Sequence, residues 1–117
     1  MKNINLMILF GSRAEGKNRS DSDIDIAVLG KNPLGLKEKT AIAIRVARAR
    51  KTPEDRVDVV DIRRASPLLQ FEIARKGELL YGKKSDFTTF QVRAWKLYQD
   101  TARLRRIREK SLERLYV

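Results

Sequence analysis

The sequence predicts an α/β chain in which short strands alternate with helices and one long amphipathic helix comes last. Several short apolar runs end at glycine or in polar loops, as buried strands do. Other segments carry apolar residues at three- and four-residue steps, as amphipathic helices do. A chain of 117 residues is long enough for one domain with a substantial core and too short for two.

The first two strands are predicted on either side of a small-residue turn. Residues 4–10 form an apolar run that ends at Gly11. We expect a single helical turn at 12–16, a polar loop at 17–22 and the second strand at 23–29. Only about a dozen residues, most of them small or polar, join the two strands. Direct, antiparallel pairing is therefore favoured over a crossover helix.

The middle of the chain alternates helix and strand. A helix is expected at 36–50, where alanine and β-branched residues form one face. The third strand is expected at 57–62, because its residues have strong β-propensity. A serine–proline pair is typical of a helix start and a glycine of a helix end, which together predict a helix at 67–76. A short edge strand is expected at 78–81.

The C-terminal third predicts one long amphipathic helix. It should begin after an N-cap at Ser85 or Asp86 and continue to about Leu115. A helix of roughly thirty residues spans about 45 Å, which is more than a domain of this size covers. We therefore expect a core at 1–84 and a C-terminal helix at 85–117 that belongs to the same single domain and binds a partner.

Composition and charge narrow the function. The chain has no Cys and no His, which excludes disulfides, a thiol nucleophile and the commonest general base, so catalysis would rest on carboxylates and oxygen-bound cations. No signal peptide or membrane span is recognisable, and we expect a cytoplasmic protein that does not contact membranes. The net charge of +11 favours an acidic or polyanionic partner. Residues 103–114 carry six basic side chains against two acidic ones.

Two aspartates at the head of the second strand are the first candidates for chemistry. Asp23 and Asp25 share one face of a strand, while Ile24 and Ile26 point to the other. Carboxylates this close repel each other and ionise together only when a cation or strong donors compensate. The preceding turn at Gly11 offers free backbone amides that can hold a phosphate. Together these features indicate Mg²⁺-dependent chemistry on a nucleotide.

A third carboxylate is expected from the third strand, where two aspartates compete. Asp58 and Asp61 are three residues apart, so they lie on opposite faces of a strand. Side-chain parity alone does not choose between them.

Three segments in this order and spacing resemble the minimal nucleotidyltransferases of the DNA polymerase β superfamily. They are Gly11-Ser12-Arg13-Ala14-Glu15-Gly16, Ser22-Asp23-Ile24-Asp25-Ile26-Ala27-Val28 and Val57-Asp58-Val59-Val60-Asp61. The resemblance covers residues 4–81. It implies the nucleotidyltransferase fold, an α/β (α+β) arrangement with a small mixed sheet of three to four strands flanked by helices.

The resemblance also implies roles for individual residues. Asp23, Asp25 and Asp58 would be catalytic and would bind two Mg²⁺ ions, which leaves Asp61 structural. The nucleotide-binding residues implied by the resemblance are Gly11, Ser12 and Arg13.

The reaction implied by the resemblance is attack of a hydroxyl on the α-phosphate of a nucleoside triphosphate with release of pyrophosphate. Small stand-alone members are similar to antitoxins of HEPN/MNT toxin–antitoxin modules, which transfer AMP from ATP to a tyrosine of a HEPN ribonuclease toxin. We expect this activity, in a hetero-oligomer with such a toxin. Two alternatives stay open: an antitoxin that occludes its toxin without catalysis, and nucleotidyl transfer to RNA or a small molecule. The basic C-terminal helix also leaves RNA contact open.

Overall fold

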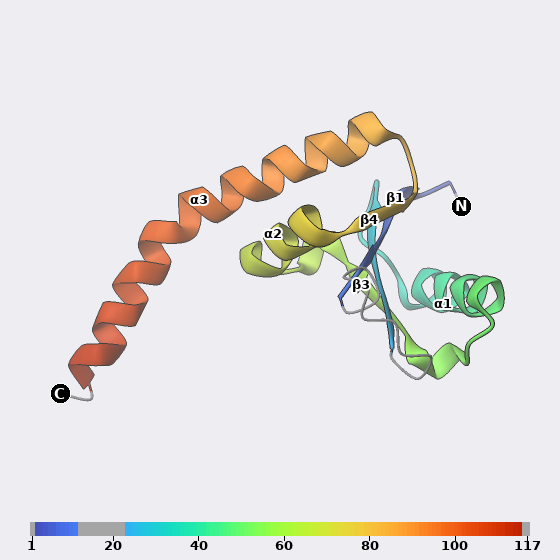
Figure 1. Ribbon diagram of the computed structural model, residues 1–117, viewed down its shortest axis with the longest axis horizontal. Helices are drawn as coiled ribbons and strands as arrows, with labels where there is room; N and C mark the ends of the chain where they lie inside the picture. Colours follow the sequence, from blue (N-terminus) through green and yellow to red (C-terminus); the bar gives the residue numbers. More distant parts are fainter. Residues whose placement is uncertain (1, 12–22, 116–117) are drawn as a thin grey trace.

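The computed structural model describes residues 2–11 and 23–115 and shows one sheet with helices on both faces (Figure 1). In chain order the elements are β1 (Ile4–Phe10), β2 (Ile24–Gly30), α1 (Leu36–Arg50), η1 (Glu54–Arg56), β3 (Val57–Asp61), η2 (Ile62–Arg64), α2 (Pro67–Lys76), β4 (Glu78–Tyr81) and α3 (Lys84–Leu115). The predicted fold class, a mixed sheet flanked by helices with a long last helix, is confirmed.

The four strands are ordered β3-β2-β1-β4. β1 pairs antiparallel with both β2 and β4, which confirms the direct pairing expected for the first two strands. β2 and β3 are parallel, and α1 supplies the crossover that a parallel pair requires. Because the two strands run the same way, their first residues lie at the same edge of the sheet. This edge positions the candidate site.

The core consists of two apolar clusters, one on each face of the sheet. On one face, β1, β2 and β3 pack against α1; the buried residues of this cluster include Met7, Leu9, Ile24, Ile26, Val28, Ile42 and Val46. On the other face, β1 and β2 pack against α2 and α3; the buried residues there include Leu6, Ile8, Ala27, Ile73, Phe90 and Ala94. Alternate residues of each strand thus face opposite clusters, as a pleated strand requires.

Three elements have bounds that differ from those expected. β2 spans Ile24–Gly30 and so begins and ends one residue later than expected. The helix α3 begins at Lys84 because the Phe87 amide donates to the Lys83 carbonyl at 3.1 Å, which places the N-cap before Ser85 and Asp86. β3 ends one residue early because η2 begins at Ile62.

The helix α3 is much longer than the body it packs on. Its 32 residues span about 48 Å, and the longest dimension of the molecule is 52 Å. Its first half covers the sheet and α2, whereas its C-terminal half leaves the body (Figure 1). In the described part of the chain, no helix has both the length and the apolar composition needed to cross a membrane.

Candidate active site

The turn after β1 brings the backbone against a carboxylate. Gly11 has a φ of +76°, in the left-handed region that favours glycine. A Cβ atom at this position would overlap Oδ2 of Asp25. Glycine therefore allows the chain to pass directly beside that carboxylate. Ser12 and Arg13, predicted to bind phosphates, lie outside the described residues, together with the rest of the segment 12–22.

The two aspartates of the second strand lie as the sequence predicts. Asp23 is exposed and directly precedes β2, and Asp25, the second residue of β2, is half-buried. Ile24 and Ile26 are buried in the cluster that packs on α1. Both carboxylates therefore belong to the opposite face, which α2 and α3 cover further along the sheet.

The register of the parallel pair decides where Asp58 lies. Asp25 of β2 is the pairing partner of Asp58 of β3. Residues paired across neighbouring strands point to the same face of a sheet. Asp58 is exposed and shares the face of Asp23 and Asp25, which parity within the third strand did not settle.

Asp61, the competing aspartate, lies on the other face and has structural partners. Its side chain is 1% exposed. Oδ2 accepts a hydrogen bond from the Leu34 amide at 3.1 Å, and Oδ1 accepts one from the Arg63 amide at 3.0 Å, which caps η2. The Arg64 guanidinium lies 3.8 Å from Oδ2. Both oxygens of Asp61 are therefore engaged in holding the end of β3 to the segment before α1.

The three carboxylates on the first face act on one another electrostatically. Burial raises the pKa of Asp25 above its ordinary value, and the negative charges of Asp58 and Asp23 raise it further. Both neighbours are thus close enough to oppose ionisation of Asp25. A cation beside these groups would reverse the effect, because it favours the charged form of each.

The donor chemistry of this face suits a hard cation, although no cage is formed. Every candidate ligand is a carboxylate oxygen, the type that Mg²⁺ prefers. Among residues 2–11 and 23–115, however, no group of three or more acidic side chains is placed to bind a single ion. The resemblance implied that Asp23, Asp25 and Asp58 bind metal ions together. The structure shows that the three carboxylates share one face of the sheet and that Asp58 and Asp23 act on the pKa of Asp25.

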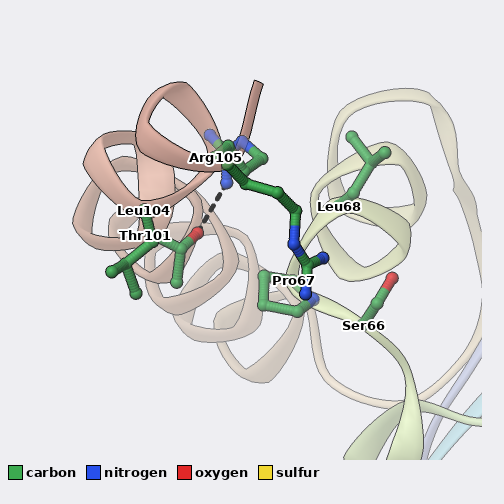
Figure 2. Close-up of a pocket in the computed structure, with 7 residues that line it drawn as sticks. Ser66, Pro67, Leu68, Thr101, Leu104 and Arg105 are labelled. Atoms are coloured by element: carbon green, nitrogen blue, oxygen red, sulfur yellow. Dashed lines mark hydrogen bonds between the residues drawn. The ribbon is translucent and has the colours of Figure 1, made fainter. Parts of the chain in front are cut away.

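A groove separate from the three carboxylates was not predicted from the sequence. It lies between the N-terminal end of α2 and the middle of α3, has a volume of about 630 Å³, and has none of the three carboxylates in its lining (Figure 2). Thr101, Arg105 and Arg108 of α3 are among its lining residues. Their three- and four-residue spacing was visible in the sequence, but the packing of α2 beside them was not.

The chain is similar to known nucleotidyltransferases. The family model described as polymerase beta, nucleotidyltransferase matches residues 1–86. A curated relative, the protein adenylyltransferase MntA of Shewanella oneidensis, is 35% identical over 96 residues, which are 82% of this chain and 67% of the relative. The chain spans about two thirds of the length of the curated relatives it matches.

Several solved structures with a similar fold are of toxin–antitoxin complexes. A chain of a toxin–antitoxin complex with AMP-PNP is 31% identical with a TM-score of 0.77, and the match covers 100% of this chain and 90% of that one. A chain of the complex between the tri-AMPylated HEPN toxin and the MNT antitoxin of Shewanella oneidensis is 29% identical with a TM-score of 0.70, over 100% and 87% of the two chains.

Proposed function

This chain belongs to the polymerase beta nucleotidyltransferase family, and we propose that it transfers AMP from ATP to a tyrosine of a HEPN-type ribonuclease toxin and acts as its antitoxin. The observation that carries the proposal is the meeting of Gly11, Asp25 and Asp58 at one edge of the sheet. The similar MntA is a protein adenylyltransferase, and a similar solved complex contains an AMPylated HEPN toxin. The proposed assembly is a cytoplasmic hetero-oligomer of the two proteins.

In this proposal Asp23, Asp25 and Asp58 would hold two Mg²⁺ ions. Bound divalent ions stabilise the entering and leaving oxygens of a phosphoryl transfer and acidify the attacking hydroxyl. Ser12 and Arg13 would bind the phosphates of ATP beside Gly11, whose lack of a side chain lets the backbone approach.

The proposed reaction is a single displacement at the α-phosphorus of ATP. The tyrosine oxygen forms a bond to the α-phosphorus of ATP while the bond from that phosphorus to the bridging oxygen breaks, so pyrophosphate leaves. The phenolic proton passes to the carboxylate of Asp58, which is exposed and can reach an incoming acceptor. Asp25 is half-buried whereas Asp23 and Asp58 are exposed, and in this proposal it sets the position of the site.

The test is transfer of AMP to a HEPN-type protein from the same organism. With ATP and Mg²⁺, mass spectrometry should show the acceptor heavier by one or more AMP groups, localised to tyrosine. The double variant Asp23→Asn, Asp25→Asn should abolish the shift. Asp55→Asn, an exposed aspartate of η1, is the matched control and should behave as the wild type. An acceptor left unmodified by the wild-type chain would contradict the proposal.

Occlusion without catalysis is the second candidate, and the exposed half of α3 favours it. Large apolar residues there, Leu104, Ile107 and Leu112, are about half exposed or more and suit contact with another protein. Cells expressing the toxin with the double aspartate variant separate the two functions. Continued growth would favour occlusion, whereas arrested growth would favour adenylylation.

A further inference from the structure

One face of the helix α3 carries a continuous row of residues, here called the contact stripe, which extends beyond the part of the helix that packs on α2 and the sheet. At alternating three- and four-residue steps, the stripe runs through Phe87, Gln91, Ala94, Tyr98, Thr101, Arg105, Arg108 and Leu112. Its first members pack on α2 and the sheet: Ala94 is buried, and Gln91 donates a hydrogen bond to the Ala74 carbonyl at 3.0 Å. Its last members, Arg108 and Leu112, are exposed. A helix face that keeps the same three- and four-residue spacing beyond the elements it packs on is suited to contact with a helix of another protein.

The last intramolecular anchor of this stripe is a stack across the two helices. The rings of Phe71 in α2 and Tyr98 in α3 are stacked, with centroids 4.2 Å apart. The guanidinium of Arg105 lies 3.9 Å from the centroid of the Tyr98 ring, donates to the Tyr98 carbonyl at 3.0 Å, and donates to Oγ1 of Thr101 at 2.6 Å. Arg105 is therefore held in place before any ligand arrives.

Just beyond this anchor the groove between α2 and α3 opens. Pro67 and Leu68 come from the N-terminal end of α2, and Leu104, Arg105 and Arg108 come from α3 (Figure 2). Leu68 is 51% exposed and Leu104 is 66% exposed. The groove has an apolar floor, two arginines and no acidic side chain in its lining. Arg108 has no ion pair or hydrogen bond with the described residues, so its charge is available.

We propose that this groove receives an acidic amphipathic helix of the acceptor protein, with an apolar side chain against Leu68 and Leu104 and carboxylates on Arg105 and Arg108. The inference rests on the proposed function only in taking the acceptor as the source of the helix. The charge balance supports this occupant, since residues 103–114 carry six basic side chains against two acidic ones. A second copy would bring two such basic segments together, which is unfavourable.

RNA is a poorer fit to the groove than an acidic helix. Single-stranded RNA is commonly bound by aromatic side chains interleaved with basic ones, whereas residues 99–115 contain no aromatic side chain. The exposed apolar residues of this segment are leucine and isoleucine, which pack against other aliphatic side chains. The planar, pre-positioned guanidinium of Arg105 matches a carboxylate through two parallel hydrogen bonds.

The test measures binding of a HEPN-type protein from the same organism to the Asp23→Asn, Asp25→Asn double variant, so that catalysis plays no part. Leu104→Asp and Arg108→Glu, placed separately in this background, should each weaken the affinity about thirtyfold, as expected for residues central to an interface. Arg103→Glu is the matched control, because it reverses the same charge on the same helix but points about 140° away from Arg108. It should change the affinity less than about threefold. All three positions are exposed, and circular dichroism should show unchanged folding.

Steady-state transfer of AMP in the otherwise wild-type chain gives an independent readout. Arg108→Glu should raise KM for the acceptor and leave KM for ATP unchanged. If Arg103→Glu weakens binding as much as Arg108→Glu, or if nuclease treatment releases the acceptor, the groove proposal is overturned. Self-association of the chain that Leu104→Asp abolishes, without acceptor binding, also overturns it. Failure of the proposed function looks different, because the wild-type chain would then bind the acceptor through the groove without modifying it.

Discussion

Replacing the two aspartates of β3 one at a time should distinguish Asp61, whose carboxylate is structural, from Asp58, whose carboxylate is proposed to be catalytic. Asp61→Ala removes the acceptor of the Leu34 and Arg63 amides. Leu34 is 2% exposed, so water does not replace the lost partner of its amide. Asp58→Ala removes an exposed side chain that has no hydrogen bond within the described residues and that opposes ionisation of Asp25.

The expected magnitudes differ clearly. An unsatisfied buried amide costs about 1–3 kcal/mol, and loss of the cap on η2 costs about 1 kcal/mol. The ion pair with Arg64 adds little, because the Arg64 side chain is 66% exposed. Asp61→Ala should therefore lower the free energy of unfolding by about 3 kcal/mol, and Tm by about 10 °C. Asp58→Ala should leave Tm unchanged or raise it, because it relieves repulsion at Asp25.

Two assays on the same preparations decide the matter. Circular dichroism gives Tm, and transfer of labelled AMP to the acceptor, measured well below the Tm of both variants, gives activity per folded molecule. Asp58→Ala should lose about a hundredfold or more in rate, and Asp61→Ala should retain most of it. An inactive Asp61→Ala with wild-type Tm, beside an active Asp58→Ala, would refute the assignment made from the strand register.

Three further predictions address other parts of the structure. Gly11→Ala should nearly abolish AMP transfer, since a Cβ there overlaps the Asp25 carboxylate; wild-type rates would show that this close approach is not needed. Without divalent ions, Asp25→Asn should raise Tm at neutral pH: a raised pKa means a stability contribution that is present below 3.8 and lost as pH rises. This gain should fade in acid, and a pH-independent gain would contradict it. A double-mutant cycle between Phe71 and Tyr98, measured by urea unfolding, should give a coupling of about 0.5–1.5 kcal/mol, and zero coupling would exclude the stack as an anchor of α3.

The parts of the fold that follow from local patterns were predictable from the sequence. The strand at 4–10 is a short apolar run before a glycine, and Ser66 accepts a hydrogen bond from the Leu69 amide at 3.2 Å, as its place before a proline indicated. The N-cap of α3 was predicted wrongly. Ser85 and Asp86 matched the capping pattern, but the first helical hydrogen bond is donated by the Phe87 amide to the carbonyl of Lys83.

The candidate site depended on information that no local pattern carries. The sequence placed Asp23 and Asp25 on one face because they belong to one strand. Placing Asp58 beside them required the pairing of two strands that are separated by the helix α1. A slip of one residue in that register would move every side chain of β3 to the other face. Burial of Asp61 against Leu34, which comes from a distant segment, was equally invisible in the sequence.

The distribution of charge gives this small molecule a way to orient an acceptor. Asp23, Asp25 and Asp58 gather three carboxylates at one edge of the sheet; burial raises the pKa of Asp25, and the charges of Asp58 and Asp23 raise it further. The chain as a whole carries +11, and the distal half of α3 is strongly basic. An acidic segment of the acceptor is therefore repelled from the carboxylates and attracted to α3. The lining of the groove contains none of the three carboxylates, so docking there leaves them free for ATP with its divalent ions and for a neutral tyrosine hydroxyl, and one chain can hold the acceptor at one surface and modify it at another.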